Sequence, residues 1–542
     1  MVRGIDNVPQ GSLLWLQGYD FNLPTPGFRV DGQLRVESAD EPQTVGVHLS
    51  SGKLTNSSTG VILVNHGPGG IRFIEGDLEN DGRMTLNALL LYTKNRSEFV
   101  QRGDVQLGAY SGIALTGRAA VLRQVAGEIR FTDITSRLEF YSNSEFHYEG
   151  GNVLGEPLVV ASHARVISPI QGTLSLRFGG LGSTLEGHLA TNLVVRLIAD
   201  YRLGAASLRL TNAPSLDGLL VLYASPGVVS PGASLVLPTS GFTNTRQGIL
   251  RILQGSDPVE VLGDLANEGS MDVQSPVRMR EQTSAFTNRG SILIGSGSSL
   301  DCETTLVQSS GLLTVLTGGE LVARGGFTLL GGSFQSAGSV IGTVSNQSVA
   351  TVFQDLRTRV QGDWIQGDEG TLRLMVHEST TEPEIAALEV TGSFQAHGTL
   401  DVRTLPGSIL AAGDSLSLVR AHRINGWFDR LLLPRLGSGL TWAVIPSENE
   451  VRLAVRAGTP PLALELVRTL RGVRLQLTGP ATTGFQAMIR SGDSKGNWTT
   501  FHQVFPFAGL ASVPISPSDV PNTERLLLFQ AELIPVDSDS SP

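Results

Sequence analysis

The sequence has 542 residues, of which 64 are glycine, 40% are hydrophobic and 17% are charged, and its formal net charge is −10. Low charge combined with high glycine content argues against a helical bundle and against a disordered chain, and the glycines lack the every-third-residue period of collagen. The acidic balance and the lack of a dense run of basic residues argue against nucleic-acid binding.

The segment from Met1 to Gln10 lacks the charged and apolar regions of a signal peptide. No apolar run approaches the roughly 20 residues that a membrane-spanning helix needs, so no transmembrane segment is expected. If the protein acts at the cell surface, we expect this chain to be a fragment or its start codon to be placed too late. The one cysteine, Cys302, excludes an internal disulfide framework and a cysteine-based zinc module, and we expect it to be buried.

A short unit recurs along the chain: an apolar residue, any residue, an asparagine, a turn and then alternating apolar positions. Its asparagines are Asn56, Asn80, Asn244, Asn267, Asn288 and, in a degenerate copy, Asn346. Asn56 and Asn80 are 24 residues apart, and Asn244 and Asn267 are 23 apart. This period, without amphipathic helices, predicts the coils of a β-solenoid, and the leucine framework of leucine-rich repeats is absent. Asparagine suits the turns and forms ladders between coils, so we assign these residues a structural role.

Strands and glycine turns alternate from Leu312 to Gly342, where each strand offers one apolar and one polar face. Three segments interrupt this pattern. The stretch Asn87 to Val100 is predicted to be a loop or an irregular coil, because it loses the glycine rhythm. Asp355 to Val360 and Glu382 to Leu388 are predicted to be short helical or loop insertions.

From Gly362 the pattern changes to longer strands with bulky aromatic residues. Its successive motifs are G-x-L-x-V, AGD-x-L-x-LV, I-x-G-x-FD, GL-x-W-x-V and V-x-L-x-V, ending at Val455. This order resembles the C-terminal cap of autotransporter-like and related secreted bacterial β-helix proteins of the passenger type. The resemblance implies a cap over the open end of the helix, with Trp427, Phe428 and Trp442 as core aromatics rather than sugar-stacking platforms. No membrane β-barrel follows in this chain, so self-export is not expected.

The sequence therefore predicts an all-β protein: a right-handed parallel β-helix with a C-terminal cap and a small C-terminal β-sandwich-like module. The expected parts are a β-helix array (1–361), the cap region (362–457), a proline linker (458–462), the β-sandwich-like module (463–535) and a disordered tail (536–542).

No catalytic residue, metal ligand or cofactor site is assigned from the sequence. The histidines lack zinc-helix spacing and no phosphate-binding loop occurs. The Gly-x-Ser-x-Gly match at Gly492–Gly496 precedes a strand rather than a helix, which predicts a hairpin turn. Arg102-Gly103-Asp104 is ordinary turn chemistry. Three polar clusters are weighed as catalytic and interpreted as solvated faces: Glu79-Asp81-Arg83, Asp272 with Arg278 and Arg280, and Asp301-Glu303.

We therefore expect a non-enzymatic extracellular or surface-displayed protein, structural or adhesin-like, that presents a lateral face to glycans, surfaces or other copies of itself. The alternative is a polysaccharide lyase or glycoside hydrolase on the same scaffold, which would need carboxylates and a basic residue on one outer face. Neither a metal nor another cofactor is expected, and the fold by itself does not decide between the two functions.

Overall fold

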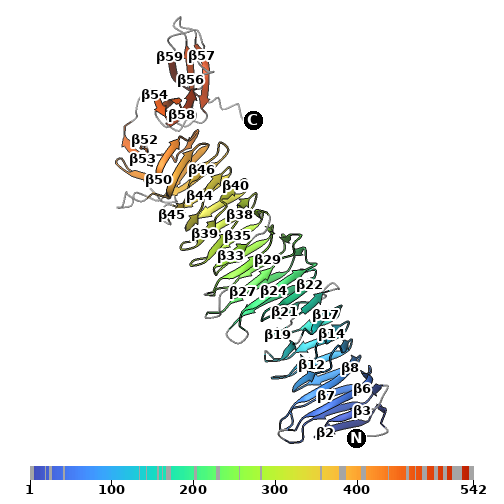
Figure 1. Cartoon of the computed structure of the whole chain (residues 1–542). Coiled ribbons are helices and arrows are strands. Elements are labelled where there is room, and N and C mark those ends of the chain that lie inside the picture. The colour runs from blue at the N-terminus through green and yellow to red at the C-terminus, as the bar shows by residue number, and fades with distance from the viewer. Residues whose placement is uncertain are drawn as a thin grey trace. The chain divides into compact units, whose positions relative to one another are not determined.

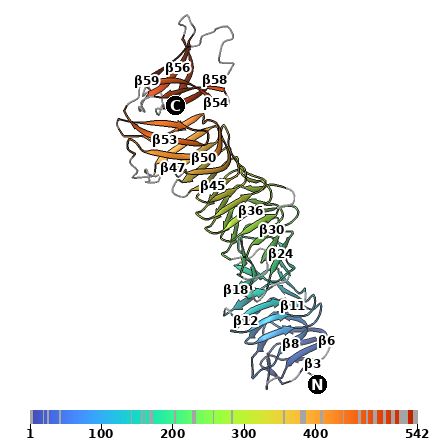
Figure 2. The same ribbon diagram turned by 60° about the vertical axis from the view of Figure 1, so that its left-hand side comes forward.

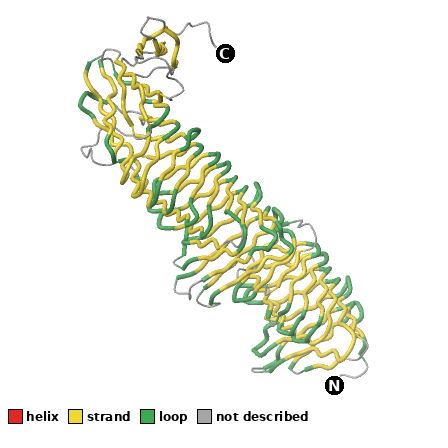
Figure 3. The backbone as a smooth tube through the Cα atoms, turned by 45° about the horizontal axis from the view of Figure 1, so that its top comes forward, coloured by secondary structure: helices red, strands yellow, loops and turns green. Residues whose placement is uncertain are grey.

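The computed structural model forms a parallel β-solenoid of about 14 turns, and the residues that it describes contain no helix (Figure 3). The chain divides into two compact units, Met1–Ser284 and Ala285–Pro542. The structure describes residues 5–18, 20–23, 27–40, 43–133, 135–141, 143–155, 158–160, 163–166, 172–200, 204–226, 232–255, 257–280, 284–353, 357–376, 386–404, 410–437, 439–458, 463–469, 472–478, 485–492, 498–504, 510–515 and 528–535.

Over residues 7–154 the coils contribute strands to three faces, and strands of successive coils lie side by side (Figure 1). Strand β4 (Gly27–Val30) pairs in parallel with the second half of β6 (Val45–Asn56), and β5 (Gln33–Glu37) pairs with β7 (Val61–Val64). One of the faces is a separate sheet of seven strands that runs from β2 (Leu13–Gln17) to β18 (Asn152–Leu154). Buried and outward positions alternate along the strands, because stacking gives every coil a shared apolar interior.

The second unit repeats this arrangement. Strands β34 (Phe286–Asn288), β35 (Ser291–Ile294) and β36 (Ser299–Cys302) pair in parallel with β37 (Leu306–Gln308), β38 (Leu312–Val315) and β39 (Glu320–Ala323). The all-β solenoid and the strands predicted from Leu312 onward are thus confirmed. Cys302 ends its strand facing inward and is 0% exposed, as predicted.

One of the three predicted interruptions is wrong. Asn87 to Val100 contains two regular strands, β10 (Leu89–Tyr92) and β11 (Glu98–Gln101), each paired in parallel with strands on both sides. Leu90, Tyr92 and Phe99 face the interior, so apolar alternation maintains the coil although glycine is missing.

The two predicted insertions lie partly outside the described residues. Asp355 to Val360 includes the start of strand β45 (Thr358–Gln361), whereas 354–356 lie outside the described residues. Glu382 to Leu388 lies outside them up to residue 385, and Leu388 begins strand β48 (Leu388–Ala396). Thr358, Val360 and Leu388 are buried, so the parts of these segments that the structure describes as strand belong to the coils.

The repeated asparagines form buried ladders between coils, as predicted. The Asn56 amide donates to Oδ1 of Asn80 at 2.6 Å, and Asn244 donates to Asn267 at 2.6 Å. Glutamine continues the ladders where the asparagine motif lapses: Asn80 donates to Gln101, and Asn288 donates to Gln308. The amide N–H groups of these asparagines find acceptors on the next coil, which avoids the roughly 1–3 kcal/mol penalty of an unpaired buried donor.

Glycine follows the ladder residues because the coils approach closely there. A Cβ atom added to Gly82 would lie 2.2 Å from the carbonyl oxygen of Ser57, and one added to Gly269 would lie 2.1 Å from that of Thr245. Neither oxygen belongs to a flexible side chain, so larger residues would force the coils apart.

Parallel stacking ends in a small antiparallel region (Figure 2). Strand β48 pairs in parallel with β50 (Ser415–Gly426), but β50 then pairs in antiparallel fashion with β53 (Glu450–Ala457), which also pairs with β52 (Leu440–Pro446). The hairpin β52–β53 therefore lies along the last long parallel strand, which is the arrangement that a cap requires.

Aromatic side chains fill these last coils. Trp364 stacks on Phe394, with ring centroids 6.3 Å apart, and Phe394 packs on Phe428 at 5.9 Å. Phe428 and Trp442 are buried, as predicted for core aromatics, and Trp442 donates its indole N–H to the Pro434 carbonyl at 2.9 Å. Trp427 differs: it is only half-buried, because its ring lies on the edge of Phe428 rather than inside the coil.

Two further sheets of three antiparallel strands follow β53 in the chain. One contains β54 (Ala463–Thr469), β55 (Gly472–Thr478) and β58 (Leu510–Ile515), and the other contains β57 (Trp498–Val504), β56 (Phe485–Gly492) and β59 (Leu528–Pro535). Gly492 ends β56, and residues 493–496 of the predicted hairpin turn lie outside the described residues, as do the linker residues 459–462 and the tail.

Candidate functional site

Glu79, Asp81 and Arg83, the first polar cluster found in the sequence, each contact a different residue instead of forming one site. The Glu79 carboxylate pairs with Lys53 at 2.8 Å, and Asp81 pairs with Arg102 at 3.3 Å. Arg83 donates instead to the Gln106 amide at 3.1 Å. Each side chain is thus held by a neighbouring coil, and Arg102 of the Arg-Gly-Asp tripeptide belongs to this same set of contacts.

The other two clusters follow the same rule. Asp272 lies 3.6 Å from Arg251, whereas Arg280 pairs with Glu260 at 3.2 Å, so the residues grouped in the sequence have different partners. Asp301 accepts two hydrogen bonds from Arg324, at 2.9 and 2.8 Å. Arg278 and Glu303 are exposed. Ion pairs therefore connect neighbouring coils on the outer faces.

A group that the sequence analysis did not single out surrounds Arg123. Its guanidinium bridges Glu149, at 2.7 Å, and Glu98, at 2.9 Å. The hydrogen bonds from Arg123 lower the pKa of Glu149 below its ordinary range, against the opposing effect of partial burial. A general acid for glycoside hydrolysis needs the opposite shift, so this lowered pKa does not favour Glu149 in that role.

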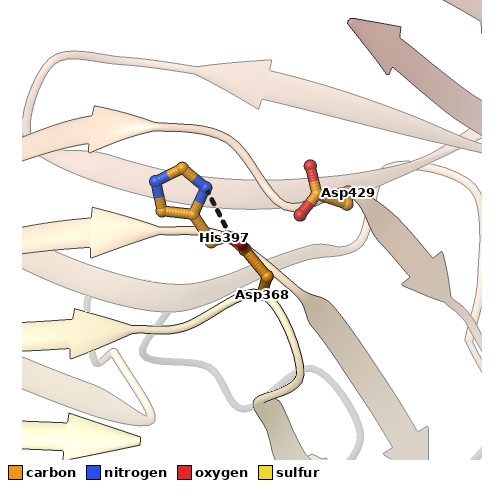
Figure 4. A group of neighbouring side chains, drawn as sticks. All are labelled: Asp368, His397 and Asp429. Atoms are coloured by element: carbon orange, nitrogen blue, oxygen red, sulfur yellow. Dashed lines mark ion pairs between the residues drawn. The ribbon is translucent and has the colours of Figure 1, made fainter. Parts of the chain in front are cut away.

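A second group that the sequence analysis did not single out contains Asp368, His397 and Asp429 (Figure 4). Asp368 follows strand β46 (Trp364–Gln366), His397 follows β48, and Asp429 immediately precedes β51 (Arg430–Leu432). Parallel pairing aligns these three turns, because Trp364 pairs with Phe394 and Phe394 with Ile424. One ligand atom from each side chain lies within 4.8 Å of the others.

The side chains of this group differ in solvent exposure. His397 Nδ1 lies 3.5 Å from Asp368 Oδ1, and the two side chains are 24% and 87% exposed. Asp429 is anchored by the backbone, since Gly398 N–H donates to its Oδ2 at 2.8 Å and Asp429 N–H donates to the Gly398 carbonyl at 2.8 Å. An imidazole nitrogen and two carboxylates form a mixed donor set that suits a divalent transition metal.

The spacing of Asp368, His397 and Asp429 in the sequence does not indicate that they lie together. Asp368 and His397 are 29 residues apart and His397 and Asp429 are 32 apart, longer than the repeat period in the low twenties. The sequence signal that could have found the group is the position of each residue. Each lies one to three positions beyond the end of a strand, and that strand contributes an aromatic or apolar residue to the same interior stack. Using it would have required the register of three coils.

A groove lies in the first unit at a corner shared by two coils. It has a volume of about 550 Å³ and is lined by the turns that follow β24 (Ala206–Thr211) and β27 (Ala233–Val236). Its lining residues are Arg209, Leu210, Thr211, Asn212, Ala213, Pro214, Leu237, Pro238, Thr239 and Ser240. Such a volume lies within the range of about 300–1,000 Å³ that is typical of small-molecule sites.

Arg209 differs from the arginines that form ion pairs between coils. The residues in register with it on the adjacent coils are Thr184 and Val236, neither of which carries a carboxylate. Among the described residues it has no ion-pair partner, whereas Arg165 on the same face pairs with Glu186 at 3.7 Å. An exposed guanidinium therefore faces this groove together with hydroxyl and amide groups.

Comparison with known proteins finds no matching family model and no matching curated protein. The established finding is therefore the fold itself, a parallel β-solenoid with an antiparallel C-terminal region. Within the described residues, no helix has the length and apolar character needed to cross a membrane.

Proposed function

We propose that this protein is a non-enzymatic binding scaffold that receives an acidic glycan in the lateral groove beside Arg209. The observation that carries the proposal is the Arg209 guanidinium, which has no ion-pair partner among the described residues, in a groove of about 550 Å³. A guanidinium recognises a carboxylate with two parallel hydrogen bonds, which favours a sugar that bears a uronic acid.

The remaining groove chemistry supports a carbohydrate. Thr211, Thr239 and Ser240 offer hydroxyl groups, and the Asn212 amide donates to Glu186 at 3.1 Å. The rings of Pro214 and Pro238 add apolar surface of the kind that packs against the C–H face of a sugar. Specific sites combine such apolar walls with a few placed polar groups.

The surrounding scaffold supports binding more than catalysis. Arg324 holds Asp301, and Arg123 holds Glu149, in hydrogen-bonded ion pairs between coils. The resemblance of residues 362–455 to autotransporter-like caps supports a place at the cell surface or outside the cell, as part of the same proposal.

The proposal is tested by calorimetric titration of the full chain with trigalacturonate and, separately, with the neutral sugar maltotriose. Replacing Arg209→Ala is expected to weaken trigalacturonate binding at least tenfold, because a hydrogen bond to a charged group contributes about 1.5–3 kcal/mol. Arg278→Ala is the matched control, since Arg278 is exposed on a strand of the same unit but lies outside the groove.

Equal affinity of both variants and the parent protein for trigalacturonate would refute the proposal, and so would an equal preference for maltotriose. Release of shorter sugars during incubation would instead favour the alternative, a polysaccharide-processing enzyme.

A further inference from the structure

We propose that Asp368, His397 and Asp429 bind a divalent transition-metal cation, with coordination positions left open for water or an anionic ligand. This site is distinct from the groove beside Arg209 and does not depend on it. The argument rests on the stacking of three turns, the donor atoms that they bring together and the support of those atoms by the backbone.

Stacking converts three distant residues into one group. Trp364, Phe394 and Phe428 form a continuous interior stack, so the turns next to them are fixed in register. Asp368 lies in the turn after β46 and His397 in the turn after β48, and Figure 4 shows the His397 ring directed toward Asp368.

The donor atoms need only a small contraction to hold an ion. They lie within 4.8 Å of one another, whereas ligands about 2.0–2.2 Å from a zinc ion lie somewhat closer together. The Asp368 side chain, 87% exposed, has room to turn inward. Asp429 is already oriented by the Gly398 N–H, and such support from outside the coordination sphere is typical of metal ligands.

The donor types select the class of ion. Two carboxylates balance a charge of +2, and the imidazole adds a nitrogen ligand that zinc, copper, iron and nickel accept. Magnesium and calcium prefer oxygen ligands alone, so they are expected to bind more weakly. Three protein ligands leave a zinc ion with an open position, as in sites where the metal binds a water molecule or a substrate.

A bound ion would join three successive turns of the chain. Residues 368, 397 and 429 belong to turns that the unfolded chain leaves apart, so binding favours the folded state. The expected consequence is a higher unfolding midpoint in the presence of the metal.

The test uses the full chain without a polyhistidine tag, after treatment with a chelator, titrated with ZnCl₂ in a calorimeter. Asp368→Asn is expected to weaken Zn²⁺ binding at least about tenfold, the lower end of the effect seen for residues that only support a ligand. Because Asp368 is exposed, this change does not disturb the core. Glu369→Gln removes a neighbouring exposed carboxylate and is the matched control, expected to bind as the parent protein does.

Co²⁺ provides a second measurement, since its visible absorption reports nitrogen and oxygen coordination. The spectrum is expected to change in His397→Ala and to persist in His422→Ala, which replaces an exposed histidine outside the group. The Zn²⁺-dependent rise in the unfolding midpoint should likewise disappear in Asp368→Asn. The proposal is overturned if the parent protein binds no Zn²⁺, if Asp368→Asn and Glu369→Gln bind it equally, or if equimolar Ca²⁺ displaces it.

Discussion

The side-chain amide of Asn56 donates a 2.6 Å hydrogen bond to Oδ1 of Asn80 on the next coil, and both side chains are 0% exposed. Asn80 in turn donates to Gln101 at 2.7 Å. A side chain that both accepts and donates inside the solenoid connects three coils, so its loss leaves unpaired groups on both sides.

Replacing Asn80→Ala is therefore expected to lower the free energy of unfolding by at least about 2 kcal/mol. The measurement is urea unfolding followed by circular dichroism. Asn87→Ala is the control: Asn87 donates to Asn65 at 3.0 Å in an exposed pair, where the expected loss stays within about 0.5 kcal/mol. Equal losses in the two variants would show that burial of the ladder does not matter.

The ion pair between Arg123 and Glu149 predicts a specific pH dependence. Hydrogen bonds from Arg123 lower the pKa of Glu149 in the folded protein below its ordinary value of about 4.5. The pair therefore contributes stability that is present above that value and is lost as the pH falls through the lowered pKa.

The urea midpoint of Arg123→Ala should thus fall below that of the parent protein at pH 7, and the difference should shrink at pH 3. Arg83→Ala provides the comparison, because Arg83 donates to the uncharged Gln106 amide. A difference that stays constant for Arg123→Ala between the two pH values contradicts the assigned pKa shift.

Much of the solenoid was predictable because its signals are local. The repeated asparagines gave the period, and alternating apolar residues gave the inward face of each strand. The prediction was wrong at Asn87 to Val100 because glycine was taken as the marker of a turn, whereas Leu90 and Phe99 maintain the coil through burial alone. Gln101 and Gln308 were missed for a similar reason, since a longer amide serves the same ladder as asparagine.

The candidate metal group was not predictable in this way. Bringing Asp368, His397 and Asp429 together depends on the register of three coils that differ in length. The groove depends on register as well: Thr184 and Val236 occupy the positions next to Arg209, so no carboxylate lies in register with it on the two adjacent strands. Only the pairing of strands reveals either relationship.

The aromatic stack in the last coils predicts a large effect from a single truncation. Phe394 lies between Trp364 and Phe428, and all three side chains are 0% exposed. Phe394→Ala is expected to lower the free energy of unfolding by about 3–5 kcal/mol, the usual result of truncating a buried aromatic residue. Trp427→Ala should have a smaller effect because Trp427 is half-buried, and thermal unfolding of the two variants side by side measures the difference.

The cap itself is tested by two deletions. The antiparallel strands β52 and β53 lie along β50, and the two small sheets follow them in the chain. Deleting everything after Pro460 keeps the cap, so this chain is expected to remain a soluble monomer. Deleting everything after Val360 removes β46 and β47 (Thr371–Val376), the partners of β43 (Val344–Asn346) and β44 (Val349–Phe353).

The shorter chain would expose the edges of parallel strands together with the apolar interior of a coil. Such edges pair with other chains, so we expect aggregates or fibres. Size-exclusion chromatography with light scattering distinguishes these states. A stable monomer after deletion at Val360 would mean that residues 362–457 are not a cap. The half-buried Trp427 would then become a candidate for ligand contact, because its ring would no longer be explained by closure of the solenoid.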